Sequence, residues 1–185
     1  MKRIFLISFC LILFNSAILA QLDRTERKLV SWVDENNDDA LELLKELINI
    51  NSGTMNFEGV KQVADRLIPK FQSLGMDSYF IDGKAWNRAG HLVAKIEGGK
   101  GPNILMIGHL DTVFEPDSPF QSWTQVDENT IKGPGIADMK GGDVIILQTL
   151  SALHDQGLLE DMNIWVVMTG DEELSGRPLS LSKKE

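Results

Sequence analysis

Three short polar segments in the second half of the chain contain residues that can bind a metal ion or move a proton. They are residues 108–112, 133–142 and 169–176. Histidine is the commonest nitrogen ligand of zinc, and carboxylate oxygens are frequent further ligands. A carboxylate beside an activated water can also act as a general base. Together these residue types indicate metal-assisted hydrolysis.

The first segment is Gly-His-Leu-Asp-Thr, in which His109 is the candidate ligand. A ligating histidine usually donates its other ring proton to a carboxylate or a carbonyl. Asp111 lies two residues later, on the same side of an extended chain. It could therefore orient His109. Taken alone, this pattern fits a satisfied surface histidine better than a ligand.

The second segment has four glycines and a proline in ten residues, which predicts an irregular loop before a helix. Asp138 lies in the middle of this loop, and one carboxylate can bridge two metal ions through its two oxygens. The alternative is a glycine-rich turn with a helix-capping aspartate. A phosphate-binding loop is excluded because Gly-Lys-Ser/Thr is missing.

The third segment contains Asp171, Glu172 and Glu173 in succession. Three adjacent carboxylates repel one another, and two metal ions would offset that repulsion. Neighbouring side chains point in different directions, so one can bind metal while another acts as general base. The alternative for this segment alone is a solvated acidic turn.

Hydrophobic spacing predicts the elements that hold these segments. Apolar residues three and four apart predict three early helices, which contain Leu29, Val30 and Val33, then Leu43, Leu44, Leu47 and Ile48, then Val60, Val63, Leu67, Phe71 and Leu74. We expect Asp38 and Asp39 to cap the second helix and Pro69 to kink the third.

Strands are predicted over residues 76–81, 91–96, 104–107 and 164–168, with a helix over residues 143–156. The last two strands are continuous apolar runs, as expected of strands buried on both faces. Strand, helix and strand in this order predict an α/β fold with a parallel or mixed sheet covered by helices. Ligands bind beyond the carboxyl ends of such strands, so the first and third segments should converge there.

The order of the three segments is more specific than any one of them. Gly-His-x-Asp-Thr, Gly-x-x-Asp-Met-Lys-Gly-Gly and Gly-Asp-Glu-Glu-x-x-Gly resemble the two-zinc hydrolase family of carboxypeptidase G, aminoacylase and succinyl-diaminopimelate desuccinylase, over about residues 38–180. The resemblance implies that His109 binds one zinc, Asp138 bridges two and Glu173 binds the other. It also implies that Glu172 is the general base, that Asp111 orients His109, and that a cis peptide follows Asp138.

The resemblance further implies a peptide or N-acyl amino acid substrate, a glutamate-type carboxypeptidase specificity, two zinc ions per full-length chain and a possible homodimer. The family's two further ligands and its smaller dimerisation domain are not in this sequence. We therefore expect residues 21–185 to be an incomplete catalytic domain with weak zinc binding, an exposed sheet edge, poor solubility and no activity alone. The alternative is a non-catalytic truncated protein or a binding module that retains the first half of the fold. A nucleotide-binding protein is disfavoured.

Residues 1–20 have a positive start, an apolar run and small residues at the end, which predicts a signal peptide and a periplasmic or extracellular protein. An uncleaved anchor and a lipoprotein at Cys10 are weaker alternatives. Cleavage would remove the only cysteine and leave no membrane segment. The formal net charge is −9 with no basic stretch, which disfavours nucleic-acid binding. His91 and His154 lie outside the motifs and are not predicted to be ligands.

Overall fold

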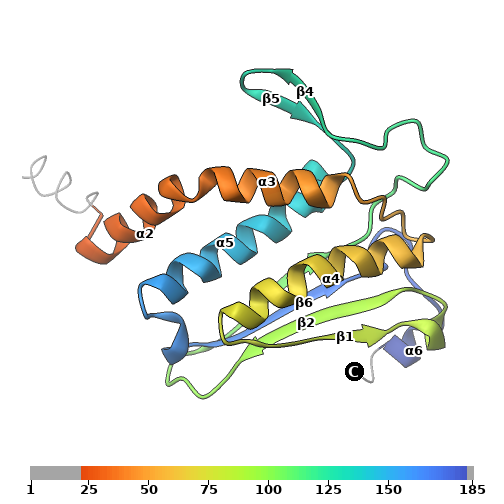
Figure 1. Ribbon diagram of the computed structural model, residues 1–185. Helices are drawn as coiled ribbons and strands as arrows, with labels where there is room; N and C mark the ends of the chain where they lie inside the picture. The colour runs from red at the N-terminus through yellow and green to blue at the C-terminus, as the bar shows by residue number, and fades with distance from the viewer. Residues whose placement is uncertain (1–21, 183–185) are drawn as a thin grey trace, which may run out of the picture.

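The computed structural model describes residues 22–182, so the predicted signal peptide lies outside the described residues (Figure 1). The helices are α2 (Arg24–Glu35), α3 (Asn37–Ile48), α4 (Phe57–Ser73), α5 (Gly141–Asp155) and the short α6 (Leu179–Ser182). The strands are β1 (Asp77–Asp82), β2 (Gly90–Ile96), β3 (Asn103–His109), β4 (Thr124–Asp127), β5 (Thr130–Lys132) and β6 (Asn163–Thr169). Within the described residues, none of the helices has the length and apolarity needed to cross a membrane.

The main sheet has the strand order β1-β2-β6-β3. β1 pairs with β2 and β2 with β6 in antiparallel fashion, whereas β3 and β6 are parallel. The connection between β3 and β6 contains α5, which is the expected βαβ unit. The predicted α/β fold with a mixed sheet is therefore confirmed. The connection also contains the β4–β5 hairpin, a separate two-stranded sheet that hydrophobic spacing did not predict.

The core lies between the sheet and the helices α3, α4 and α5, which lie on the same side of it (Figure 1). Leu47 of α3 and Phe71 of α4 are completely buried, as are Ile164, Val166 and Met168 of β6. The three β6 residues alternate along the strand and so share one face. Each large apolar side chain contributes about 1.5–3 kcal/mol when it is removed from water.

β3 differs from the prediction that it is buried on both faces. It lies at the edge of the sheet, and Leu105 and Ile107 are 60% and 66% exposed. The prediction was wrong because a continuous apolar run does not show whether another element covers its outer face. β6, the other strand with this prediction, is fully buried only on its helix-facing side.

One local prediction about the helices also differs from the structure. α3 begins at Asn37, directly after Asn36 ends α2, so Asp38 and Asp39 lie in its first turn and are not caps. Carboxylates in this turn still favour the positive end of the helix dipole. Pro69 lies inside α4, and the helix continues past it to Ser73.

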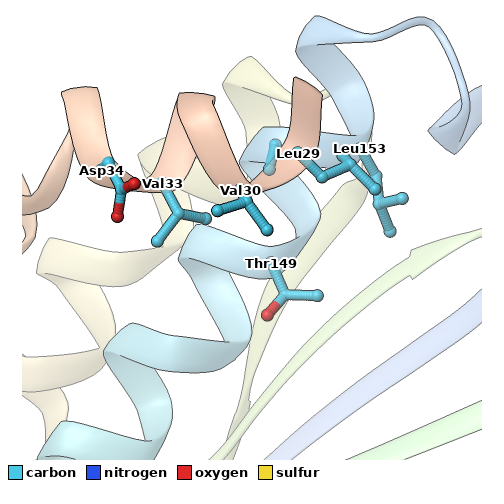
Figure 2. Close-up of a pocket in the computed structure, with 7 residues that line it drawn as sticks. Leu29, Val30, Val33, Asp34, Thr149 and Leu153 are labelled. Carbon is cyan, nitrogen blue, oxygen red and sulfur yellow. The ribbon is translucent and has the colours of Figure 1, made fainter. Parts of the chain in front are cut away.

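An apolar pocket with a volume of about 270 Å³ lies between α2 and α5 (Figure 2). It is lined by Leu29, Val30, Val33, Asp34, Thr149, Ala152 and Leu153. The α5 residues in this lining come from the second half of the helix, whereas Asp138 precedes its first residue. The pocket is therefore separate from the three polar segments.

Candidate metal centre

The first and third segments meet at the carboxyl ends of β3 and β6. The two strands are parallel neighbours, with His109 opposite Thr169 in the register. The Leu110 N–H donates to the Thr169 carbonyl oxygen at 2.7 Å, which continues the pairing beyond the strands. His109 and the acidic residues after β6 are thus brought to one edge of the sheet, as predicted.

The second segment reaches the same edge through a tight turn, Ile136–Lys140, directly before α5. Gly135 enters this turn with φ 76°, a left-handed conformation that favours glycine. Asp138 has extended backbone angles, φ −141° and ψ 94°, and its side chain is not a helix cap. The peptide bond after Asp138 is cis, as the resemblance implied.

Lys140 anchors this turn from inside the protein. Its side chain is completely buried, and its ammonium group donates to the Leu47 carbonyl at 2.9 Å and the Ile50 carbonyl at 2.8 Å. These carbonyls lie at the C-terminal end of α3, where the helix dipole favours a cation. Burial lowers the pKa of Lys140 to about 8. The turn that carries Asp138 is therefore tied to α3.

His109, Asp138 and Glu173 form a cluster in which one ligand atom from each lies within 4.8 Å of the others. The shortest contact joins His109 Nε2 to an Asp138 carboxylate oxygen at 2.9 Å. His109 is buried, Asp138 is exposed and Glu173 is intermediate. The structure thus brings together the three residues that were predicted as ligands.

The other ring nitrogen of His109 points back into the protein. Nδ1 lies 3.1 Å from the backbone carbonyl oxygen of Asp111 and 3.6 Å from its nearer carboxylate oxygen. When the ring proton is on Nδ1, the lone pair of Nε2 is free and faces the cluster, as binding of a metal ion requires. Burial lowers the pKa of His109, but its hydrogen bonds with Asp111 and Asp138 outweigh this effect and raise the pKa to about 9.

The Asp111 carboxylate has a larger structural role than orientation of His109. It accepts the Thr54 hydroxyl at 2.7 Å and the backbone N–H groups of Glu172 and Glu173, both at 3.1 Å. Asp111 is completely buried. Burial raises its pKa, but the hydrogen bonds from His109, Thr54 and the two N–H groups outweigh this effect and hold the pKa below its usual range. Asp111 therefore links the first segment to the third.

The three acidic residues after β6 have different surroundings. Asp171 is buried and accepts the Gly176 N–H at 2.9 Å, which closes the loop on itself. Glu172 is exposed, so its carboxylate is free to meet a substrate or water. Burial raises the pKa of Glu173, and the nearby Asp138 carboxylate raises it further. The three adjacent carboxylates therefore differ in burial and in their contacts.

Four buried residues around the cluster were not predicted as part of the site. They are Thr54, Arg88, His91 and Asp143. None belongs to a motif, and only the spatial contacts show their connection to the site. Asp143 follows the paired glycines at the start of α5, and within residues 22–182 its carboxylate has no hydrogen-bond partner. Burial raises its pKa to about 8.

Comparison with known proteins agrees with this geometry. Residues 105–183 match the family model described as Peptidase family M20/M25/M40. The chain is 32% identical to carboxypeptidase G2 of a Pseudomonas species over 133 residues, which are 72% of this chain and 32% of that protein. It is 34% identical to succinyl-diaminopimelate desuccinylase of Methylobacterium radiotolerans over 143 residues, 74% of this chain and 35% of that protein. The chain thus spans about a third of the length of these relatives.

Solved structures show the same fold. Human carnosine dipeptidase 1 superposes with a TM-score of 0.69 at 19% identity, over 80% of this chain and 35% of that protein. An M20 family metallo-carboxypeptidase from Sulfolobus solfataricus superposes with a TM-score of 0.60 at 23% identity, over 72% of this chain and 31% of that protein. The matched residues 105–183 contain His109, Asp138 and Glu173. Over these residues the chain is similar to peptidase family M20/M25/M40.

Proposed function

We infer that the protein, in the form its source produces, is a hydrolase of peptide or N-acyl amide bonds that uses two zinc ions. The observation that carries this proposal is the cluster of His109, Asp138 and Glu173, with Glu172 as the neighbour of a ligand. The named relatives include a carboxypeptidase, a desuccinylase and a dipeptidase. Similarity to these relatives therefore supports a reaction at a C–N bond.

The residues present fit a metal ion. One imidazole nitrogen and two carboxylates are a donor set that zinc accepts. The Asp138 and Glu173 carboxylates approach each other closely enough to raise the pKa of Glu173, so a cation between them would remove an electrostatic cost. Asp138 can offer its two oxygens to two ions. Its exposed side chain leaves room for a second ion and for ligands from outside residues 22–182.

Zinc would supply Lewis acidity that polarises the substrate carbonyl and makes water a better nucleophile at neutral pH. Glu172 accepts a proton from the attacking water as the new C–O bond forms. It then donates that proton to the leaving amine nitrogen as the C–N bond breaks, so one water is consumed per bond cleaved. The backbone amide of Glu172 is fixed on Asp111, which holds the base beside the ligands.

We place glutamate-type carboxypeptidase specificity first among the possible substrate preferences. The sequence similarity to carboxypeptidase G2 supports this choice. A substrate panel should contain peptides and N-acyl amino acids with C-terminal glutamate, matched compounds with C-terminal alanine, and N-succinyl amino acids. Preferential release of glutamate agrees with the proposal, and preferential desuccinylation contradicts it.

The decisive test combines metal content with a Glu172→Gln variant of the protein as its source makes it. We expect about two zinc ions per wild-type chain, and a loss of turnover on the order of 10²–10⁴-fold in the variant with its zinc retained. The exposed Glu160→Gln is the matched control and should keep full activity. A wild type that binds zinc but cleaves no amide would contradict the hydrolase assignment.

Secretion is the second part of the proposal, and it rests on the pattern of residues 1–20. We expect the mature protein to begin at Gln21 and to be found in the periplasm or the medium. N-terminal sequencing of the protein from its source, together with cell fractionation, tests this. A native protein that retains Met1 and stays in the cytoplasm would contradict it.

A further inference from the structure

The loop between β6 and α6 that carries the acidic residues contacts a region that no motif contains, the connection between β1 and β2. This connection includes the short helical turn Lys84–Trp86 and continues into β2 at Gly90. Its residues lie about 80 positions before the loop in the sequence. This connection and the start of β2 nevertheless form hydrogen bonds with both ends of the loop.

Arg88 makes the strongest of these contacts. Its Nε donates to the Leu174 carbonyl at 2.6 Å, and one Nη donates to the Ser175 carbonyl at 3.3 Å. The other Nη donates to the Asn87 carbonyl at 2.6 Å. Arg88 is only 8% exposed, so these bonds form away from water, where each is worth more. The guanidinium group therefore fastens the two residues directly after Glu173.

The start of the loop is held by His91. Its Nδ1 accepts the Gly170 N–H at 3.2 Å, and its ring stacks on Trp86 with centroids 5.1 Å apart. At the other end, Gly176 packs on Trp86 so closely that an added Cβ would lie 2.4 Å from the indole ring. His91 of β2 thus contacts the loop immediately before its acidic residues, and Arg88 of the β1–β2 connection contacts it immediately after them.

These contacts complement those of Asp111, which accepts the N–H groups of Glu172 and Glu173. The loop is therefore fixed through its amides by Asp111 and through its carbonyls by Arg88. An arginine suits this place because its planar, rigid fork can reach two successive carbonyls, which the single ammonium group of lysine does less well.

We propose that Arg88 is a positioning residue of the hydrolytic site, which fixes Glu172 and Glu173 by binding the Leu174 and Ser175 carbonyls. This inference rests on the proposed hydrolase function. It assigns Arg88 no contact with substrate or metal. Its effect passes through the loop, so its loss should reduce turnover more than substrate binding, because a small displacement of a reacting group can cost about 100-fold in rate.

The test uses Arg88→Ala and Arg88→Lys in the protein as its source makes it, loaded with zinc. We expect Arg88→Ala to lower kcat by roughly 10- to 100-fold with KM changed less than about twofold. Added guanidinium ion, below denaturing concentrations, should restore part of kcat in Arg88→Ala. The kcat of Arg88→Lys should lie between those of the wild type and Arg88→Ala. Lys84→Ala, which removes an exposed cation from the same connection, is the matched control and should match the wild type.

A second measurement separates positioning from general stability. Cobalt in place of zinc reports ligand geometry through its visible absorption, and we expect the Arg88 variants to shift that spectrum because Glu173 moves. A folded Arg88→Ala with wild-type kcat and cobalt spectrum would overturn the inference. If Arg88→Ala does not fold, an unchanged kcat and spectrum in Arg88→Lys would overturn it. A wild type that neither binds zinc nor cleaves amides overturns the proposed function itself, and the inference with it.

Discussion

The loop over residues 170–176 and the β4–β5 hairpin are both exposed connections on this α/β core, but they are held in opposite ways. The loop receives hydrogen bonds from Arg88, His91 and Asp111, residues more than 60 positions away in the sequence. The hairpin's side-chain hydrogen bonds join residues two positions apart, such as Asp127 and Asn129. In Figure 1 it projects away from the sheet and helices.

This difference shows where the fold fixes geometry. Long-range bonds to backbone amides and carbonyls restrict a loop in several directions, which a catalytic constellation requires. Local bonds fix only the shape of a turn and leave its orientation to the two connecting segments. The site loop is therefore expected to be sensitive to remote substitutions, and the hairpin tolerant of them.

Asp111→Ala should have the largest effect. It leaves the Thr54 hydroxyl and the N–H groups of Glu172 and Glu173 without their buried acceptor, at a cost of about 3–5 kcal/mol. Zinc affinity and turnover should decrease together with the free energy of unfolding. Chemical denaturation and zinc titration measure both effects. The hairpin control Asp127→Ala should leave zinc binding unchanged, and equal losses in the two variants would remove the distinction between the regions.

Lys140→Met should have the next largest effect. The substitution keeps most of the apolar stem but leaves the Leu47 and Ile50 carbonyls without their donor, and it removes the positive charge near Asp143. We expect a loss of about 2–3 kcal/mol in the free energy of unfolding, measured by urea denaturation. The hairpin residue Lys132 is exposed, so Lys132→Met is the matched control. A neutral Lys140→Met would show that α3 does not anchor the turn.

The ligands could be predicted from sequence because they lie in compact motifs at strand ends. His109 and the acidic residues needed only the parallel pairing of β3 and β6, which the βαβ pattern supplied. Arg88 and Thr54 could not be predicted in this way. The partners of Arg88 are backbone carbonyls, which every residue has, so the sequence does not mark them. The partner of Thr54 is the Asp111 carboxylate, 57 positions away, and no local pattern connects the two residues.

The lack of long-range information in a local pattern also explains what the sequence analysis got wrong or missed in the fold. The exposed face of β3 depends on which element covers Leu105 and Ile107, and no local pattern contains that information. The hairpin was missed because β4 and β5 are short and mostly exposed, so they lack the apolar alternation of a half-buried strand. Local periodicity predicts buried elements well and exposed elements poorly.

His91 should give the site loop a pH dependence of stability that the hairpin lacks. Burial lowers the pKa of His91, although the Asp171 and Asp111 carboxylates oppose this. The unfolded chain therefore binds a proton more readily, and stability is complete above pH 6.5 and falls as the pH decreases toward the lowered pKa. The slope is at most about 1.4 kcal/mol per pH unit.

Denaturation of the chelator-treated protein between pH 5 and 6.5 measures this slope, and His91→Gln should reduce it. The contribution of His109 to stability depends on pH in the opposite direction, because the pKa of His109 is raised to about 9. Its contribution is complete well below pH 6.5 and is lost as the pH rises through 9. Because His109 is present in both proteins, its effect cancels in the difference between the slopes of the wild type and His91→Gln. Equal slopes in wild type and variant would contradict a buried, neutral His91.

The smallest effect is expected for Val126→Thr in the hairpin. Val126 is 49% exposed, and the substitution keeps the branched shape that suits a strand. The free energy of unfolding should change by less than about 0.5 kcal/mol, with zinc binding and kcat unchanged. A KM increase with unchanged stability would have a different meaning. It would show that the hairpin contacts substrate in the protein as its source makes it, and that tolerance of the fold to substitution there does not extend to activity.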